Sequence, residues 1–212
     1  MKKFLVACVA GTLASAGGFV GAANAAFVNF VAEAAGNERG VADGTTIVMD
    51  GLAVTFHAGP GGSDYAYFDD LFEGRPAGLG VCQKLEGAPP SECDDTTDDN
   101  IRAGESVTLT FDGPLNLSGF SFSGEEHYDL NSSSETLLLN GVEFTFADVA
   151  NLTAAVAAVV TGISSIEFAY GGSNAAQFYV NWFTAEIPLP AAAPLLLAGI
   201  AGLSFASRRR KA

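Results

Sequence analysis

The stretch TLLLNGVEFTF, residues 136–146, decides the fold class of this 212-residue chain. At its centre is Asn140-Gly141, a dipeptide that accepts the positive φ angles of a two-residue turn between paired strands. The flanking segments Thr136–Leu139 and Val142–Phe146 are apolar or alternate apolar with polar residues, as half-buried strands do. The stretch therefore predicts an antiparallel β-hairpin.

The same signals recur on both sides of this hairpin. Asp50-Gly51 predicts a second two-residue turn, Asp112-Gly113-Pro114 predicts a turn that separates two strands, and Gly119 predicts a bulge because it shifts the alternation. The other predicted strands are Thr45–Met49, Leu52–His57, Ser106–Phe111, Leu115–Ser123, Ser164–Tyr170 and Gln177–Ala185. Short strands separated by turn signals indicate an all-β fold, an antiparallel β-sandwich of jelly-roll-like type.

One short helix interrupts the predicted strands at Asp148–Val160. Apolar residues recur there at helical spacing, Asp148 suits the N-cap, and Gly162 suits the position after the last turn. Because Val156–Val160 is short and rich in valine, a further strand is the alternative.

Charged residues are distributed unevenly along the chain. All 24 acidic residues but only four of the 10 basic ones lie in residues 26–186, so this segment has a net charge of −20. Nucleic-acid binding needs clustered Lys and Arg to neutralise phosphates, and this composition excludes it. The segment holds all but three of the 16 Phe and the single Trp, enough aromatic residues to build a core.

Residues 1–25 have the pattern of a secretory signal peptide. Lys2-Lys3 precede an apolar stretch, Phe4–Val20, and Ala23-Asn24-Ala25 forms a small-x-small cleavage site before Ala26. We therefore expect export into an oxidising compartment and a mature chain that starts at Ala26. An N-terminal membrane anchor is the alternative.

The segment 187–212 combines three features. It opens with Ile187-Pro188-Leu189-Pro190-Ala191, continues without a charge to Ala206, and ends in Arg208-Arg209-Arg210-Lys211. Its apolar stretch is near the short limit of a bilayer-spanning helix, and basic residues that follow such a helix stay in the cytoplasm. We therefore expect a transmembrane helix that leaves the domain of residues 26–186 outside.

This order of motif, apolar helix and basic end resembles the VPLPA-type PEP-CTERM sorting domain, with Ile187 where the family has Val. The resemblance implies export by a Gram-negative bacterium and a partner enzyme, an exosortase-type transpeptidase that cleaves near the motif. The tail would then anchor the chain in the inner membrane only before processing. The domain would end at the cell surface or in the extracellular matrix.

A second resemblance lies inside the domain. The ectodomains of many PEP-CTERM proteins share a series of short motifs that this chain matches over about half of its mature length. The matching residues are Gly78-Leu79-Gly80-Val81-Cys82, Cys93, Asp98-Asp99-Asn100, Gly104-Glu105, Phe120-Ser121-Phe122 and His127. This ectodomain type implies no particular activity.

Cys82 and Cys93 remain as an even pair once Cys8 leaves with the signal peptide. In an exported chain such a pair predicts a disulfide. Closing a loop of this length stabilises a fold by roughly 3 kcal/mol. The spacing differs from C-x-x-C, which argues against redox catalysis.

The segment Asp94–Asn100 holds four Asp and one Asn next to Cys93. Hard oxygen ligands suit Ca²⁺, and repulsion among carboxylates favours a bound cation. We expect Ca²⁺ at Asp98, Asp99 and Asn100, with Glu105 as a fourth source of oxygen. A solvated acidic loop, in which Asp and Asn make local turn hydrogen bonds, is the alternative.

Other polar and aromatic residues give weaker signals. Glu125-Glu126-His127 follows a predicted strand, but only His57 could supply a second imidazole for a zinc site. Tyr65, Tyr67 and Trp182 could stack on sugar rings or fill the core.

The sequence carries no G-x-S-x-G, H-E-x-x-H, P-loop or Rossmann motif. We therefore expect a non-catalytic surface or matrix protein that contacts extracellular polysaccharide through cations or stacking. The alternatives are a secreted carbohydrate-active hydrolase, which would use a pair of carboxylates, and a purely structural or adhesive subunit.

Overall fold

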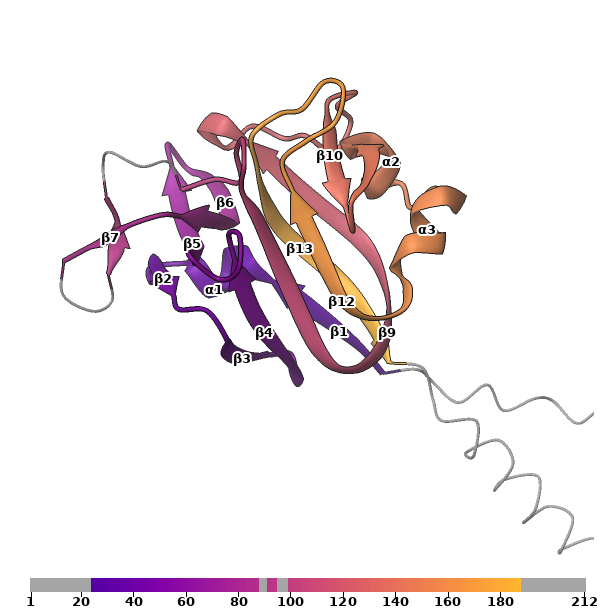
Figure 1. Cartoon of the computed structure of the whole chain (residues 1–212), viewed down its shortest axis with the longest axis horizontal. Coiled ribbons are helices and arrows are strands. Elements are labelled where there is room, and N and C mark those ends of the chain that lie inside the picture. Colours follow the sequence, from indigo (N-terminus) through magenta and orange to yellow (C-terminus); the bar gives the residue numbers. More distant parts are fainter. Residues whose placement is uncertain (1–23, 88–90, 95–98, 188–212) are drawn as a thin grey trace, which may run out of the picture. The chain divides into compact units, whose positions relative to one another are not determined.

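Antiparallel strand pairing dominates the computed structural model, which describes residues 24–87, 91–94 and 99–187 (Figure 1). In chain order the elements are β1 (Asn24–Asn29), α1 (Phe30–Ala34), β2 (Arg39–Val41), β3 (Thr45–Met49), β4 (Leu52–Ala58), β5 (Tyr65–Phe72), β6 (Arg75–Cys82), β7 (Leu85–Glu86), β8 (Glu92–Cys93), β9 (Ser106–Gly124), η1 (Glu125–His127), β10 (Thr136–Leu139), β11 (Val142–Thr145), α2 (Phe146–Ala150), α3 (Ala154–Val160), β12 (Thr161–Ala169) and β13 (Phe178–Ile187). The expected all-β class is confirmed.

The long strand β9 belongs to two groups of strands. Its first half pairs with β4 and β12, which continue to β3 and to β10 and β11. Its second half pairs with β13, which also pairs with β1 and β6, and β6 continues to β5 and β2. Figure 1 shows the bend in β9 between the two halves.

The hydrophobic core lies between these two groups. Phe56 of β4 meets Phe68 of β5 with ring centroids 5.4 Å apart, and Phe168 of β12 meets Phe122 of the second half of β9 at 6.2 Å. Both are edge-to-face contacts, the arrangement that aromatic rings favour in cores. The fold is therefore sandwich-like, with aromatic rings filling the space between its layers.

Both predicted two-residue turns are confirmed. Asp50 and Gly51 have φ angles of 47° and 80°, and β3 pairs with β4 around them. Asn140 and Gly141 have φ angles of 49° and 76°, and β10 pairs with β11. The bulge predicted at Gly119 is present, because the β9–β13 register shifts on both sides of Trp182 and Gly119 has a φ of 60°.

The turn predicted at Asp112-Gly113-Pro114 is wrong. These residues stay in strand conformation inside β9. The β12 register moves from Ser165 opposite Thr110 to Ile163 opposite Leu115, so no residue of β12 is registered with 111–114. Pro114 thus falls where a missing N–H costs no ladder hydrogen bond to β12.

The single helix predicted at Asp148–Val160 is two helices, α2 and α3. Asp148 is not the N-cap of α2: Thr145 is, and Asp148 completes a capping box with it. Asn151 ends α2, and Leu152 has a positive φ of 47°. The predicted role of Gly162 is confirmed: α3 ends at Val160 with Thr161 as its C-cap, and Gly162 follows at the C′ position with a positive φ of 67°.

The described chain begins and ends on neighbouring strands. Asn24 of β1 is registered with Ile187 of β13, and Asn29 with Trp182. The expected cleavage point between Ala25 and Ala26 therefore falls inside β1. Ala23, the motif residues Pro188-Leu189-Pro190-Ala191 and the basic residues Arg208-Arg209-Arg210-Lys211 lie outside the described residues. Within the described part, no helix combines the length and apolar character that crossing a bilayer requires.

Candidate functional site: an acidic pocket

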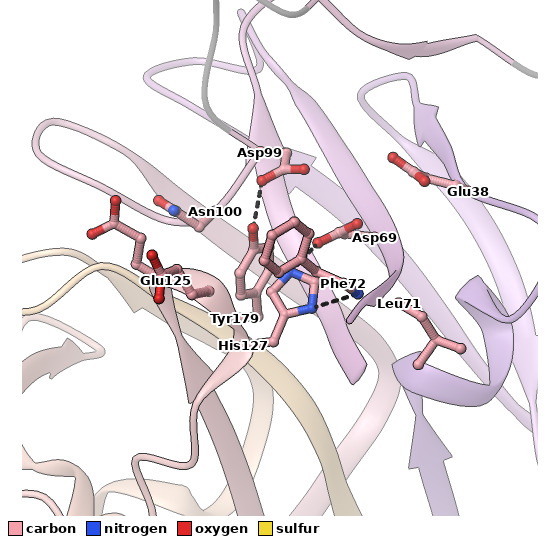
Figure 2. Close-up of a pocket in the computed structure, with 10 residues that line it drawn as sticks. Glu38, Asp69, Leu71, Phe72, Asp99, Asn100, Glu125, His127 and Tyr179 are labelled. Atoms are coloured by element: carbon pink, nitrogen blue, oxygen red, sulfur yellow. Dashed lines mark hydrogen bonds and ion pairs between the residues drawn. The ribbon is translucent and has the colours of Figure 1, made fainter. Parts of the chain in front are cut away.

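A cavity of about 390 Å³ opens where β5, β13 and η1 meet the segment before β9 (Figure 2). Three carboxylates from separate parts of the chain border it: Glu38 ahead of β2, Asp69 of β5 and Asp99 ahead of β9. One oxygen from each lies within 4.8 Å of those of the other two. Like charges at this distance repel, so the pocket favours a cation or a proton.

Strand geometry explains how Asp69 reaches the pocket. In β5, successive side chains alternate between faces, so Tyr67 and Asp69 point away from the core side occupied by Phe68. Register brings Glu38 close, because its neighbour Arg39 in β2 pairs with Phe68. Asp69 is only 7% exposed, so its charge is poorly solvated.

Each carboxylate accepts a bond from a buried or half-buried donor. The Tyr67 hydroxyl donates to Glu38 Oε1 over 2.5 Å, and the Tyr179 hydroxyl donates to Asp99 Oδ1. Burial raises the pKa of Glu38; the Tyr67 hydrogen bond opposes this rise, and the charge of Asp69 adds to it. The environment of Glu38 therefore penalises its charged form unless a positive partner is supplied.

His127 lies at one wall of the pocket, beside Asp69. Its Nε2 lies 2.9 Å from Asp69 Oδ2, and its Nδ1 lies 2.8 Å from the Arg75 carbonyl oxygen and 3.2 Å from the Phe72 amide nitrogen. Burial lowers the pKa of His127, but hydrogen bonds to Asp69 and Arg75 and the charges of Asp69 and Asp99 outweigh it, so the pKa is raised. Asp69 at Nε2 and the Arg75 carbonyl at Nδ1 thus favour the imidazolium form, whereas the Phe72 amide, which donates toward Nδ1, opposes it.

The backbone at His127 is unusual as well. Glu126 and His127 have φ angles of 56° and 60°, a backbone region that residues other than glycine rarely adopt. In this conformation the imidazole contacts Phe72 and Tyr179 edge-to-face, with ring centroids 5.9 Å and 5.2 Å away. Strained residues of this kind cluster at functional sites.

The structure brings together two of the four predicted calcium ligands. Asp99 and Asn100 both line the pocket, and Asn100 is buried. Asp98 lies outside the described residues. Glu105 lies elsewhere: its carboxylate accepts from the Gln83 side chain at 2.8 Å and from the Arg102 amide at 3.1 Å.

Burial raises the pKa of Glu105, although the bonds from Arg102 and Gln83 oppose the rise. Glu105 was chosen from the sequence because it is close to Asp99 along the chain. In the structure, the carboxylates that meet Asp99 are 30 or more residues away in the sequence. Glu38, Asp69 and Tyr179 were missed because nothing in their local sequence marks them. Their meeting depends on strand pairing across the sheet.

The predicted disulfide is confirmed and supports the pocket. Cys82 and Cys93 are bonded, with Cα atoms 5.8 Å apart. The Cys93 amide donates to the Tyr67 hydroxyl at 3.0 Å, and this hydroxyl in turn donates to Glu38. The cross-link therefore positions a donor that holds one of the three carboxylates.

The glycines of the Gly78-Leu79-Gly80-Val81-Cys82 motif have a steric role beside the pocket. A Cβ on Gly80 would lie 1.9 Å from the Asp99 carbonyl oxygen, and one on Gly78 would lie 2.5 Å from the Val180 carbonyl oxygen. The Val81 amide donates to the Asp99 carbonyl at 3.1 Å. Glycine thus allows the Asp99–Asn100 backbone to lie directly on β6.

The remaining candidates are placed apart. His57 pairs with Asp43 at 2.8 Å and does not approach His127 as a second zinc ligand among the described residues. Tyr67 is fully buried, so of its two alternatives, stacking on sugars and filling the interior, the structure favours the second. Trp182 is partly exposed and lines a second cavity.

In comparisons with known proteins, no family model, curated protein or solved structure matches the chain.

Proposed function

We propose that this chain is an exported, non-catalytic protein of the cell surface or extracellular matrix whose domain binds Ca²⁺ and contacts polysaccharide. The sorting part of the proposal rests on the Ile187–Ala191 motif and the apolar and basic segments that follow it. In this proposal, the first 25 residues are removed, and an exosortase-type transpeptidase then cleaves near the motif. The sandwich-like domain, which we propose is of the jelly-roll type, is the part that remains outside.

The cation part of the proposal rests on one observation, the convergence of Glu38, Asp69 and Asp99 on one cavity. Ca²⁺ takes six to eight oxygen ligands from carboxylates, amides, carbonyls and water. The Asn100 side chain at the same cavity offers an amide oxygen. A domain with so negative a charge also concentrates cations around itself.

Thermal unfolding tests the cation. A ligand at 100 times its Kd that binds only the folded state stabilises it by about 2.7 kcal/mol, or about 5–10 °C for a domain of this size. We expect such a shift with Ca²⁺ relative to EDTA, and loss of the shift in Glu38→Gln with Asp99→Asn. Asp112→Asn, an exposed acid far from the pocket, is the control.

Equal shifts from Ca²⁺ and from Mg²⁺ at the same ionic strength would contradict a specific site. The hydrolase alternative is tested on the same proteins with a panel of glycosides. Turnover that disappears in Asp99→Asn would replace the non-catalytic proposal, because paired carboxylates are the groups that glycoside hydrolysis uses.

Intact-mass measurement on protein from its own host tests the sorting. We expect a chain that starts at Ala26 and ends near the Ile187–Ala191 motif. A chain that retains residues 192–212 at steady state would instead support a permanent anchor.

A further inference from the structure

A second cavity, of about 480 Å³, adjoins the acidic pocket at His127, which lines both. It is bordered by the second half of β9, by β13 and by the chain segment that follows η1. Its size is within the range of sites that hold small organic ligands.

The floor of this cavity is a polar sheet face that the fold has buried. Phe120 and Phe122 of β9 point into the core, so Ser121 and Ser123 between them point the other way. Neither serine is more than 3% exposed, and Asn181 of β13 is 6% exposed. Polar side chains on such a face would ordinarily hydrogen-bond to water, so when they are buried they need other hydrogen-bond partners.

The partners are incomplete at Asn181. Ser123 Oγ donates to Asn181 Oδ1 at 3.0 Å and also lies 3.2 Å from the Ala77 carbonyl oxygen. Ser121 Oγ accepts from Asn131 Nδ2 at 3.0 Å. The second amide atom of Asn181 has no hydrogen-bond partner among the residues that the structure describes, although the side chain is more than nine-tenths buried at the cavity. A polar group in that position is available to a ligand.

Two aromatic rings flank this amide. Trp182 lines the cavity from β13, resting on Phe27 with centroids 6.4 Å apart, and is partly exposed. Tyr128 is 42% exposed and lies against Gly124, where a Cβ would come within 2.6 Å of its ring. In the described part of the chain, neither the Tyr128 hydroxyl nor the Trp182 indole N–H makes a hydrogen bond to protein.

We propose that this cavity is a binding site for a neutral saccharide unit. Aromatic faces pack on the C–H face of a sugar ring, while planar amides and hydroxyls bond its hydroxyl groups. Arg75 pairs with Glu73 at 3.2 Å and His127 pairs with Asp69 at 2.9 Å, so both basic side chains at the cavity already have a carboxylate partner, and the strongly acidic domain disfavours anionic ligands. The inference rests on the proposed contact with polysaccharide and names the surface that makes it.

The protein carries its own reporter for the test, because Trp182 is the single tryptophan of the chain. The purified full chain is titrated with neutral hexasaccharides built from glucose, xylose, mannose and N-acetylglucosamine while tryptophan emission is recorded. We expect a saturable change in emission with at least one of them. Tyr128→Ala should raise its Kd by about tenfold, whereas Tyr128→Phe, which keeps the ring, should leave the Kd within about twofold.

The matched control is Phe72→Ala, an aromatic ring of similar exposure that lines the acidic pocket instead. If Phe72→Ala weakens binding and Tyr128→Ala does not, the sugar binds at the acidic pocket, and the inference fails while polysaccharide binding stands. If no hexasaccharide changes the emission at millimolar concentration, the inference fails. Co-sedimentation of the same protein with insoluble polysaccharide then decides separately whether the proposed contact fails with it.

Discussion

Replacing Gly80 with alanine should damage stability and cation binding together. Gly80 has no positive φ, so its backbone accepts alanine, and the conflict is purely steric. The new Cβ would lie 1.9 Å from the Asp99 carbonyl oxygen and 3.0 Å from the Asn100 Cα, where ordinary contacts begin at 3.4 Å. Both obstacles are backbone, so no side chain can rotate away. The Asp99–Asn100 segment has to retreat from β6 by about 1.5 Å at the carbonyl oxygen, the shortfall from ordinary contact.

The cost follows from that displacement. The Val81 amide loses its bond to the Asp99 carbonyl, which contributes about 1 kcal/mol, and forced repacking costs about 1–3 kcal/mol. Alanine recovers about 0.4–1 kcal/mol by restricting the unfolded chain. We therefore expect the free energy of unfolding to fall by about 1–3 kcal/mol. The carboxylate of Asp99 moves with its backbone, so the stabilisation by Ca²⁺ should shrink as well.

Urea unfolding with and without Ca²⁺ measures both effects. Gly113→Ala is the control, because a Cβ there meets nothing within 4 Å and its φ is ordinary. This control should leave stability unchanged or slightly higher. A Gly80→Ala protein as stable as the control, with its full response to Ca²⁺, would refute the steric reasoning.

Three further predictions follow from local contacts. The pKa of His127 is raised, so its imidazolium, paired with Asp69, stabilises the fold fully below about pH 6.5, and this contribution is lost as the pH rises through the folded-state pKa. In His127→Gln, the free energy of unfolding should depend less on pH between these two pKa values. An unchanged pH profile would count against the pair. Removing the disulfide with Cys82→Ala and Cys93→Ala should lower the free energy of unfolding by roughly 3 kcal/mol in denaturant titrations, and a loss under 1 kcal/mol would show that the loop is held by other contacts. Thr145→Ala removes the N-cap of α2 and should cost about 1 kcal/mol by thermal unfolding, whereas no loss would mean that packing alone sets this helix start.

Local signals in the sequence were sufficient wherever a turn is decided by its own residues. Asp50-Gly51 and Asn140-Gly141 need positive φ angles, and both dipeptides tolerate them at little cost. Glu73 and Gly74 make the same kind of turn between β5 and β6, with φ angles of 50° and 80°, but Glu is a weak signal for it. The hairpin that carries Asp69 was therefore not predicted.

Signals that depend on a distant partner were misleading. Asp112-Gly113-Pro114 contains the residues of a turn, yet they lie where β9 bends and β12 has no residue in register. The candidate site shows the same limit, because the acidic loop was recognisable while its partners are distant in the sequence: Glu38 lies just before β2, and Asp69 lies in β5, which pairs with β2. Composition could locate Asp99 and Asn100 but could not select the carboxylates that meet them.

The direction of β13 relates the two cavities to the proposed sorting signal. Tyr179 at the acidic pocket and Asn181 at the second cavity lie near the beginning of β13, whereas Ile187, where the motif starts, is its last residue. At about 3.4 Å per residue, Tyr179 lies roughly 27 Å from Ile187 along the strand. Because Asn24 of β1 is registered with Ile187, the two ends of the described chain lie together at the end of β13 away from Tyr179. Processing near Ile187, as proposed, would therefore act at the end of β13 that is remote from Tyr179 and the acidic pocket.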